Sequence, residues 1–470
     1  MFASGIKTGK NSLISNTSKD PVWRKRFIFV LGISLSLISC GGHPPYDPNW
    51  VSSGEKVLFQ GVANSNRDDG IEAFKDGDFE LAVKRFEEAV FSNSNDPEVQ
   101  IYLNNSRAAS QESSLKIAAV VPIDENAKSA QEMLRGIADA QTLVNDEGGA
   151  GGKLVQVIIA NDGNDPERAR GIARELAVDY DILGVIGHNS SDASKAALTE
   201  YKVDNLAMIS PTSTSIDLQD PLFFRTVPSD RDNGKKLAEY AEATGIEKVA
   251  VFYNPDSAYS NSLRREFENS FTQSNGSILN SIEINDDNFD PKQQIEMIRG
   301  QVDAIALFPN TNTRNVAIGL ARANTELFKT KLPMLGGDTL YSVDTLNSGA
   351  AAVDGLVIAI PWFPISQEYA KRAEKRWKGA VNWRTAASFD ATLALLKALE
   401  NDTELTRDLV RQNLRDLNIS SSETSGEPLA FSSGERRVEP ILVKIVPDAS
   451  GRPRDLHNGF QLIKETVPLF

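Results

Sequence analysis

Cysteine is nearly absent from this chain of 470 residues, in which Cys40 is the only one. A lone thiol cannot form an intrachain disulfide or supply a multi-cysteine metal site. Histidine is scarce as well: His43, His188 and His457 are the three, and none stands in a HExxH or HxxxH arrangement. We therefore predict no zinc centre and expect each histidine to be a polar surface or loop residue.

The chain also lacks the short motifs of common enzyme and nucleotide sites. It contains neither a GxSxG nucleophile motif nor a Walker lysine motif. The glycine cluster at residues 148–152 does not read GxGxxG and follows a helical pattern instead of a strand, so we interpret it as a tight turn. Acidic residues are frequent, and we expect them on solvated faces, without an acid–base role. The sequence thus predicts a protein that is not an enzyme and has no cofactor.

Positive charge is in deficit, because 50 Lys and Arg stand against 64 Asp and Glu, for a formal net charge of −14. The first 39 residues are basic, so the rest of the chain is more acidic than the whole. Nucleic-acid binding needs a basic stripe to meet the phosphates, and this sequence has none. We expect no nucleic-acid partner. The length allows about three units of roughly 150 residues each.

The N-terminal segment has the pattern of a secretion signal. The basic cluster at residues 24–26 precedes the apolar run Phe27–Ile38, which is too short to span a bilayer. The stretch Leu37–Cys40 resembles the bacterial lipobox, in which the cysteine is lipidated and becomes the first mature residue. We predict a signal peptide over residues 1–39 and lipidation of Cys40. The protein would then lie on the periplasmic or cell-surface side of a bacterial membrane, attached through its lipid anchor only.

Residues 40–65 are rich in Gly, Pro, Asn and Ser and predict a tether. Residues 66–112 predict helices, and the segment resembles a tetratricopeptide repeat in its small and aromatic residues: Gly70, Phe74, Gly77, Phe79, Ala82, Phe86, Ala89 and Pro97. The resemblance covers about one and a half repeats, fewer than the three or so of a stable solenoid. Two interpretations stay open: a helical hairpin that packs on the main domain or acts as a spacer, and a docking surface for a protein partner.

From Leu115 onward, apolar strands alternate with amphipathic helices. The run Lys116–Val121 is continuously apolar after its first residue, as expected for a strand covered on both faces. Repeated β–α units of this kind predict parallel, doubly wound sheets. More than ten such elements exceed one sheet, so we predict two similar α/β lobes, with strands expected at 116–121, 154–159, 182–186, 207–209, 249–253, 304–308, 334–336 and 356–360.

Two loops rich in hydroxyl side chains follow successive predicted strands, at residues 187–191 and 210–215. Ligands of open α/β sheets bind beyond the carboxyl ends of the strands. The first loop opens a helix at about Asp192, where free N–H groups attract an anion such as a carboxylate. Either loop alone is better explained as a helix cap at Ser191 or a polar turn. The pair, about 20 residues apart, favours a ligand site.

A family resemblance rests on five short motifs in order and spacing: Ile186–His188, Ile209–Pro211, Phe224–Thr226, Gly336–Asp338 and Ala387–Ala391. They resemble the leucine/isoleucine/valine-binding protein family, the type I periplasmic binding proteins of ABC importers, over residues 115–470. The resemblance implies two doubly wound lobes joined by three crossovers near residues 226, 361 and 430, preceded by the short all-α hairpin. Lobe 1 would be 115–226 and 362–430, and lobe 2 would be 227–361 and 431–470.

The resemblance also implies a ligand site. It assigns carboxylate binding to Ser191, second-loop contacts to the backbone of Thr212 and to Thr214, an aromatic wall to Tyr259, and the partner of the α-ammonium to Asp338. Charged ligand ends need such matched partners when they are buried.

Two departures from the family pattern bear on the ligand. Asn310 or Thr311 stands where the family often has a second aromatic, and Asp338 is shorter than the glutamate of some relatives. Both leave room for a ligand larger or more polar than leucine.

We therefore predict the solute-binding component of an ABC importer, with an amino-acid-like ligand and an ABC permease as partner. Two alternatives remain. One is an interaction module similar to the outer-membrane lipoproteins that activate peptidoglycan synthases, which also join tetratricopeptide-like helices to this fold. The other is a ligand-sensing receptor without a transport role. The hydroxyl loops, Tyr259 and Asp338 favour solute binding, whereas the helical segment favours the interaction module.

Overall fold

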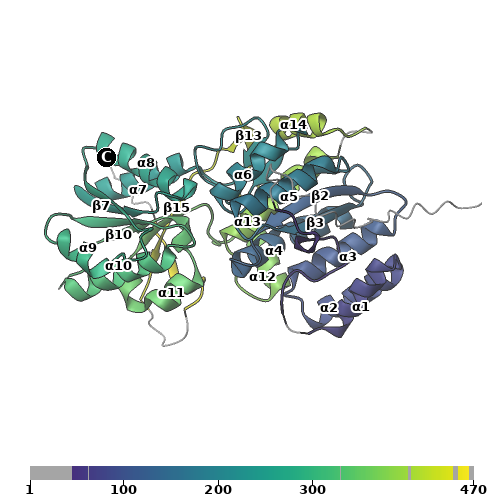
Figure 1. The fold of residues 1–470 in the computed structure, drawn as a ribbon, viewed down its shortest axis with the longest axis horizontal. Helices are drawn as coiled ribbons and strands as arrows, with labels where there is room; N and C mark the ends of the chain where they lie inside the picture. The colour runs from purple at the N-terminus through teal and green to yellow at the C-terminus, as the bar shows by residue number, and fades with distance from the viewer. Residues whose placement is uncertain (1–44, 62, 329, 401–403, 448–453, 465–470) are drawn as a thin grey trace, which may run out of the picture. The chain divides into compact units, whose positions relative to one another are not determined.

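Two mixed β-sheets organise the chain, each at the centre of one lobe (Figure 1). The computed structural model describes residues 45–61, 63–328, 330–400, 404–447 and 454–464. The predicted signal peptide and the predicted lipidation site Cys40 lie outside these residues. None of the helices in the described ranges is long and apolar enough to span a bilayer.

The first sheet has nine strands in the order β1-β3-β2-β4-β5-β6-β14-β13-β12. Its strands are β1 (Val51–Ser52), β2 (Leu115–Val121), β3 (Val155–Asn161), β4 (Ile182–Ile186), β5 (Met208–Ser210), β6 (Phe223–Arg225), β12 (Asn418–Ile419), β13 (Leu429–Ser432) and β14 (Glu435–Arg436). The central five, β3-β2-β4-β5-β6, are parallel, as the β–α pattern predicts.

The second sheet has seven strands in the order β16-β15-β11-β10-β9-β7-β8. They are β7 (Lys248–Tyr253), β8 (Ser277–Glu283), β9 (Ala304–Phe308), β10 (Met334–Gly336), β11 (Val357–Ile360), β15 (Ile441–Ile445) and β16 (Phe460–Leu462). Here β8-β7-β9-β10-β11 are parallel, while β15 and β16 pair antiparallel at the other edge.

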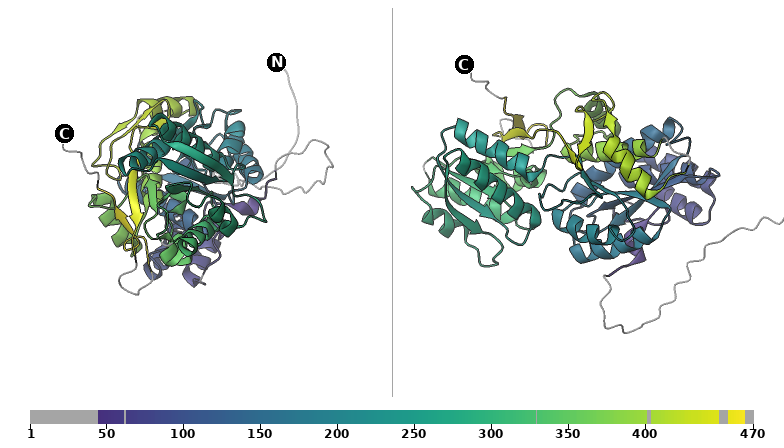
Figure 2. Two further views of the ribbon diagram at one scale, coloured as in Figure 1. Left: turned by 90° about the vertical axis from the view of Figure 1, so that its left-hand side faces the viewer. Right: turned by 90° about the horizontal axis from the view of Figure 1, so that it is seen from above.

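Helices cover both faces of each sheet (Figures 1 and 2). In β2, Ile117 and Ala119 pack on the side of α4 (Ala127–Asp146) and α13 (Trp383–Ala398), while Ala118 and Val120 pack with α5 (Pro166–Val178) and α6 (Ser191–Tyr201). Burial on both faces explains the continuous apolar run in the sequence. In lobe 2, α7 (Asp230–Ala243) and α8 (Ala258–Gln273) cover one face, and α9 (Pro291–Met297) and α10 (Arg314–Leu327) cover the other.

The chain passes between the sheets three times: after β6, after β11, and between β14 and β15. The last passage lies between Arg436 and Ile441, later than the predicted position near residue 430. The reason is that β13 and β14 form a hairpin that joins the first sheet beside β6 before the chain leaves it.

Part of the segment expected to be a tether forms an edge strand of the first sheet. Val51 and Ser52 form β1, which pairs antiparallel with β3. The guanidinium of Arg168 also lies 4.1 Å from the ring centroid of Trp50. Two strand residues carry no detectable periodicity, so sequence patterning could not reveal this pairing.

The predicted helices of residues 66–112 are present as α1 (Ser65–Lys75), α2 (Phe79–Ser92) and α3 (Pro97–Ala109). Ala82 and Ala89 are buried, and a Cβ on Gly70 would lie 2.7 Å from the Phe86 ring, so α1 and α2 approach closely. Whether the segment is a tetratricopeptide repeat stays a prediction.

The third helix belongs to lobe 1. The amide of Asn104 on α3 donates to Thr142 of α4, and that of Asn105 donates to the carbonyl of Val157 in β3. Figure 1 shows α3 beside β3, with α1 and α2 beyond it. The helical segment therefore packs on lobe 1 through α3, and docking of a protein partner on it stays a prediction.

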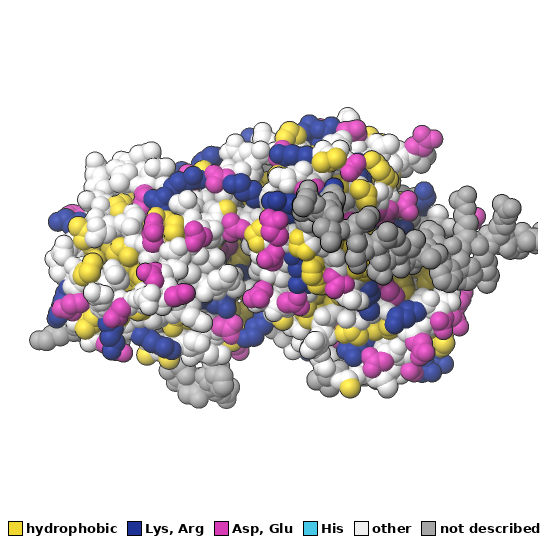
Figure 3. Space-filling view, viewed as in Figure 1, with side chains coloured by type: hydrophobic (Ala, Val, Ile, Leu, Met, Phe, Trp, Pro, Cys, Tyr) yellow, Lys and Arg dark blue, Asp and Glu magenta, His cyan; other side chains and the backbone are white. Residues whose placement is uncertain are grey.

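Charges of both signs alternate on the face drawn in Figure 3, where Lys and Arg side chains lie among Asp and Glu.

Candidate functional site

A cavity of about 520 Å³ lies where loops of both lobes meet, and its volume is typical of a small-molecule site. The five parallel strands of each sheet lie in the same order, β3-β2-β4-β5-β6 in the first sheet and β8-β7-β9-β10-β11 in the second. In each, the strand that comes second along the chain lies on one side of the first, and the other three follow on the opposite side. In such sheets the ligand site lies beyond the carboxyl ends of the strands, at the point where the order reverses.

The cavity wall follows this rule in both lobes. Loops after β2, β3, β4 and β5 contribute Asn126, Asn164, Ser191 and Thr212, while loops after β7, β8, β9 and β10 contribute Asn254, Asn285, Asn310 and Asp338. Equivalent edges of two similar sheets thus face one cavity.

Four of the five predicted ligand residues line this cavity: Ser191, Thr212, Tyr259 and Asp338. They come from both lobes and from widely separated parts of the chain. Thr214 is not part of the wall. It is fully buried, and its carbonyl accepts the backbone N–H of Asp230 at 2.8 Å, at the first crossover between the lobes.

The first hydroxyl loop leaves Ser191 available to a ligand. Ser190, not Ser191, caps α6, because its side chain accepts the N–H of Ala193 at 3.1 Å. Ser191 is the first residue of the helix, and its hydroxyl oxygen accepts the N–H of Ser215 at 3.3 Å. The Ser191 O–H therefore remains a donor beside the helix N-terminus, which suits a carboxylate.

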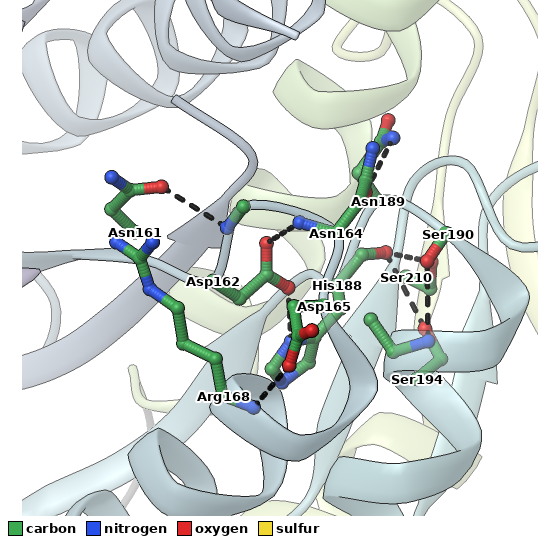
Figure 4. Close-up of polar contacts among 12 residues, drawn as sticks. Asn161, Asp162, Asn164, Asp165, Arg168, His188, Asn189, Ser190, Ser194 and Ser210 are labelled. Atoms are coloured by element: carbon green, nitrogen blue, oxygen red, sulfur yellow. Dashed lines mark hydrogen bonds and ion pairs between the residues drawn. The ribbon is translucent and has the colours of Figure 1, made fainter. Parts of the chain in front are cut away.

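Behind the loop lies a buried chain of polar groups, shown in part in Figure 4. His188 Nδ1 is 2.7 Å from Asp162 Oδ2, and His188 Nε2 is 3.0 Å from the Tyr201 hydroxyl. All three side chains are fully buried. His188 lies in the loop after β4, as expected, but it is fully buried and not at the surface. Its burial is possible because Asp162 and Tyr201 satisfy both of its ring nitrogens.

The carbonyl of His188 also ties the two hydroxyl loops together. It accepts the hydroxyls of Ser210 at 2.9 Å and of Thr212 and Ser213 at 3.3 Å each. These hydroxyls therefore hold the loops in place. Thr212 faces the cavity with its own hydroxyl bonded to protein carbonyls, which agrees with the expected contact through its backbone.

Arg225 fixes the second loop from below. Its fully buried guanidinium donates to the carbonyls of Ser213, Ser215 and Leu218, and its Nε lies 3.0 Å from a Glu435 carboxylate oxygen. A buried guanidinium is stable only when paired and hydrogen-bonded in this way. Through Arg225, the motif Phe224–Thr226 thus holds the second hydroxyl loop in place next to the site.

Lobe 2 presents buried ionisable groups to the cavity. Burial raises the pKa of Asp338, and the neighbouring Tyr259 hydroxyl and Arg384 guanidinium oppose that rise. Burial and the charge of Asp338 raise the pKa of Tyr259 well above 10, so the phenol keeps its proton. A Cβ on Gly337 would lie 2.2 Å from the Tyr259 hydroxyl oxygen, so glycine is needed where the phenol crosses the backbone.

One carboxylate bridges the two lobes at the edge of the cavity. Asp192 of α6 accepts the backbone N–H of Ala258 at 2.8 Å and the hydroxyl of Ser257 at 3.3 Å, both at the N-terminus of α8. The positive end of the α8 dipole favours a negative charge there. We call this contact the Asp192 bridge.

Most of the amides in the wall, as well as Trp383 and Arg384, were not predicted from the sequence. The amides carried a usable signal, because Asn126, Asn164 and Asn254 each follow a predicted strand as the two hydroxyl loops do. Trp383 and Arg384 gave no such signal, since they open a helix after the second crossover. Asn310 and Thr311, noted as departures from the family pattern, both lie in the wall. No cluster of three His, Cys, Asp or Glu in the described parts of the chain is arranged to hold a metal ion.

Residues 114–439 match a protein family described as periplasmic binding protein. The Leu/Ile/Val-binding protein of Escherichia coli K12 is 22% identical over 283 residues, which cover 58% of this chain and 76% of that protein. Helices α1–α3 precede the matched region.

Solved structures share the fold at low sequence identity. An ABC transporter substrate-binding protein from Desulfitobacterium hafniense, solved with Leu, superposes with a TM-score of 0.62 at 22% identity, over 75% of this chain and 100% of that one. A leucine binding protein from Thermotoga maritima gives a TM-score of 0.65 at 18% identity, over 74% and 98% of the two chains.

Proposed function

Since the chain belongs to the periplasmic binding protein family, we propose that it is the solute-binding component of an ABC importer and holds an amino acid or a similar small polar ligand between its lobes. The observation that carries this proposal is the pairing of opposite chemistries across one cavity. Ser191 offers a hydroxyl donor at a helix N-terminus, and Asp338 offers a buried carboxylate. These match the carboxylate and the ammonium of an amino acid.

Relatives support this assignment. The similar E. coli protein is a Leu/Ile/Val-binding protein, and the similar structure from D. hafniense holds Leu. In our proposal a ligand contacts both lobes at once and so stabilises their closed arrangement, together with the Asp192 bridge. A permease would then recognise the closed form.

We also propose a lipid anchor at Cys40 and a location on the periplasmic or cell-surface side of a bacterial membrane. The basic cluster, the short apolar run and the lipobox-like Leu37–Cys40 support this part of the proposal. Retention of the chain in a detergent phase, lost on Cys40→Ala, is the expected result. An equal distribution of both forms would contradict the anchor.

A second candidate, an interaction module resembling the peptidoglycan-synthase activators, is favoured by one observation on α2. Phe91 is 90% exposed and Leu81 is 41% exposed, although Ala82, Phe86 and Ala89 of the same helix are buried. In that function the helical hairpin would bind a protein, and the cavity would need no ligand.

Isothermal calorimetry of the purified chain against the free amino acids tests the main proposal. We expect at least one to bind, and we expect Asp338→Asn to weaken it by about 100-fold because the ammonium loses its charged partner. Ser191→Ala removes one hydrogen bond and should cost about fivefold. Asp416→Asn and Ser277→Ala, at exposed positions, serve as matched controls. Failure of every amino acid to bind would reject solute binding of this class and favour the interaction module.

A further inference from the structure

The cavity contains a guanidinium whose Nε makes no hydrogen bond and which forms no ion pair within the described residues, although the charge of Asp338 acts on it. Arg384 is the second residue of α13 and lines the cavity, with its guanidinium carbon 4.1 Å from the ring centroid of Trp383. Its Nε is buried without a hydrogen bond, and no side chain among the described residues forms an ion pair with it. Burial lowers the pKa of Arg384, and the charge of Asp338 opposes that effect.

The buried arginines Arg407 and Arg436 are fully engaged, whereas Arg384 is partly exposed and lines the cavity. Arg407 donates to four backbone carbonyls, and Arg436 pairs with Asp390 at 2.6 Å. Leaving a desolvated guanidinium without a partner costs free energy, so proteins normally avoid it. Arg384 departs from this pattern at a place where a ligand would arrive.

The surrounding wall does not suit an aliphatic side chain. Apart from the rings of Trp383 and Tyr259 and the ring of Pro166, the wall consists mainly of amide, hydroxyl and charged groups, including the amides of Asn126, Asn164, Asn189, Asn254, Asn310 and Asn312. A branched-chain side chain would bury these groups without giving them hydrogen-bond partners, which lowers affinity.

The acidic residues of the wall leave Arg384 free to meet an anion. Asp256 and Asp287 are exposed at the rim, and Asp256 accepts the amide of Asn285 at 2.6 Å. Asp192 is engaged at the N-terminus of α8. Only Asp338 is a buried carboxylate of this wall, and in the proposed function it is neutralised by the ligand ammonium.

We propose that Arg384 determines specificity by binding a second anionic group, so that the ligand is an acidic amino acid or a similar amino dicarboxylate and not a branched-chain amino acid. This inference rests on the proposed function, in which Ser191 and Asp338 take the α-carboxylate and the α-ammonium. A carboxylate on the side chain would accept charge-assisted hydrogen bonds from the guanidinium, which are among the strongest in proteins.

Calorimetric titrations with L-glutamate, L-aspartate, L-glutamine and L-leucine test it. We expect the better of the two acids to bind at least about tenfold more tightly than glutamine or leucine. Arg384→Met should weaken binding of that acid by about 30-fold and change glutamine binding little, so that the preference is lost. Arg384→Lys keeps the charge and should retain part of the preference. Arg299→Met, at an exposed arginine paired with Glu296, should leave all four affinities unchanged.

The outcomes separate this inference from the proposed function. If leucine binds as tightly as the acids, Arg384 does not set a preference for an anion, while solute binding stands. If none of the amino acids binds, both proposals fail. An Arg384→Met variant with a normal thermal transition and an unchanged acid-to-glutamine ratio would also overturn the inference. Should that variant not fold, the selectivity of the unaltered chain and of Arg384→Lys decides.

Discussion

Both lobes present the carboxyl ends of parallel strands to the cavity. Their polar groups differ in whether protein partners satisfy them. In lobe 1 the hydroxyls of Ser210, Thr212 and Ser213 are engaged with the His188 carbonyl, and His188 itself is held by Asp162 and Tyr201. In lobe 2, Asp338 is buried with its pKa raised. The loops of lobe 1 are therefore held in place before a ligand binds. In lobe 2, burial disfavours the negative charge of Asp338, and a cationic ligand group can neutralise that charge.

The largest effect should come from breaking the preorganised side. Asp162→Ala removes the carboxylate that holds His188 Nδ1 and leaves a buried ring nitrogen without its partner. We expect the free energy of unfolding to fall by about 3 kcal/mol, measured by urea denaturation. Asp181→Ala, at an exposed carboxylate paired with Lys116, is the control and should change it by no more than about 0.5 kcal/mol. Equal stability of the two variants would show that the His188 network does not support lobe 1.

A second prediction concerns a buried acid at the crossover into lobe 2. Burial raises the pKa of Asp230 to about 7, with the hydroxyls of Thr214 and Ser262 opposing the rise and Asp338 adding to it. An acid whose pKa is raised in the folded state binds its proton more tightly there, so its contribution to stability falls as pH rises from about 4 to about 7.

Asp230→Asn should remove this loss. We expect the variant to be more stable than the unaltered chain by about 2 kcal/mol at pH 8 and nearly equal to it at pH 4, by thermal unfolding at both pH values. A stability difference that does not depend on pH would contradict the assignment, because an amide cannot titrate.

A third and smaller effect tests the packing of Tyr259 on the backbone of lobe 2. In Gly337→Ala the new methyl group would meet the phenol oxygen, so Tyr259 must shift in the cavity. We expect affinity for the best amino-acid ligand to fall about tenfold, a result typical of a displaced binding group. Gly379→Ala is the matched control, because a Cβ there meets only the Trp377 carbonyl, at 3.8 Å. Unchanged affinity in Gly337→Ala would remove Tyr259 from the site.

The smallest effect should come from the Asp192 bridge. Asp192→Asn keeps the shape of the side chain but removes the charge at the α8 N-terminus. We expect a loss of about 0.5–1 kcal/mol in ligand affinity, and the loss should shrink at high salt. Glu80→Gln, in the first turn of α2, a helix that contributes nothing to the cavity wall, controls for charge alone. A loss that is the same for both variants would mean that Asp192 acts only through net charge.

The sequence predicted those parts of the fold that repeat. The apolar run of β2 and the β–α alternation predict parallel sheets, because burial of a strand on both faces demands apolar residues throughout. The five central strands of each sheet are parallel as predicted, but antiparallel strands at the edges make both sheets mixed. Short elements without periodicity were beyond reach: β1 has two residues, and the β13–β14 hairpin that delays the third crossover ends in a strand of two residues.

The candidate site divides in the same way. Ser191, Thr212, Tyr259 and Asp338 were placed together by a family resemblance, and the structure brings them to one cavity. His188 could not be recognised as buried, since its partner Asp162 lies 26 residues earlier and only the fold joins them. Arg384 enters the cavity from a helix whose position depends on the second crossover, so no local pattern indicated it.

The region that matches the family is shorter than the region that packs as one folded unit, as helix α3 and strand β1 show. Similarity to the family begins at residue 114, yet α3 is buried over most of its length against β3 and α4. A polypeptide trimmed to the matched region would lose the amides of Asn104 and Asn105. It would also expose to water the apolar surface of β3 and α4 that α3 covers. At the other end the match stops at residue 439, before β15 and β16 complete the second sheet. Recombinant fragments should therefore begin no later than residue 45 and retain the last strands.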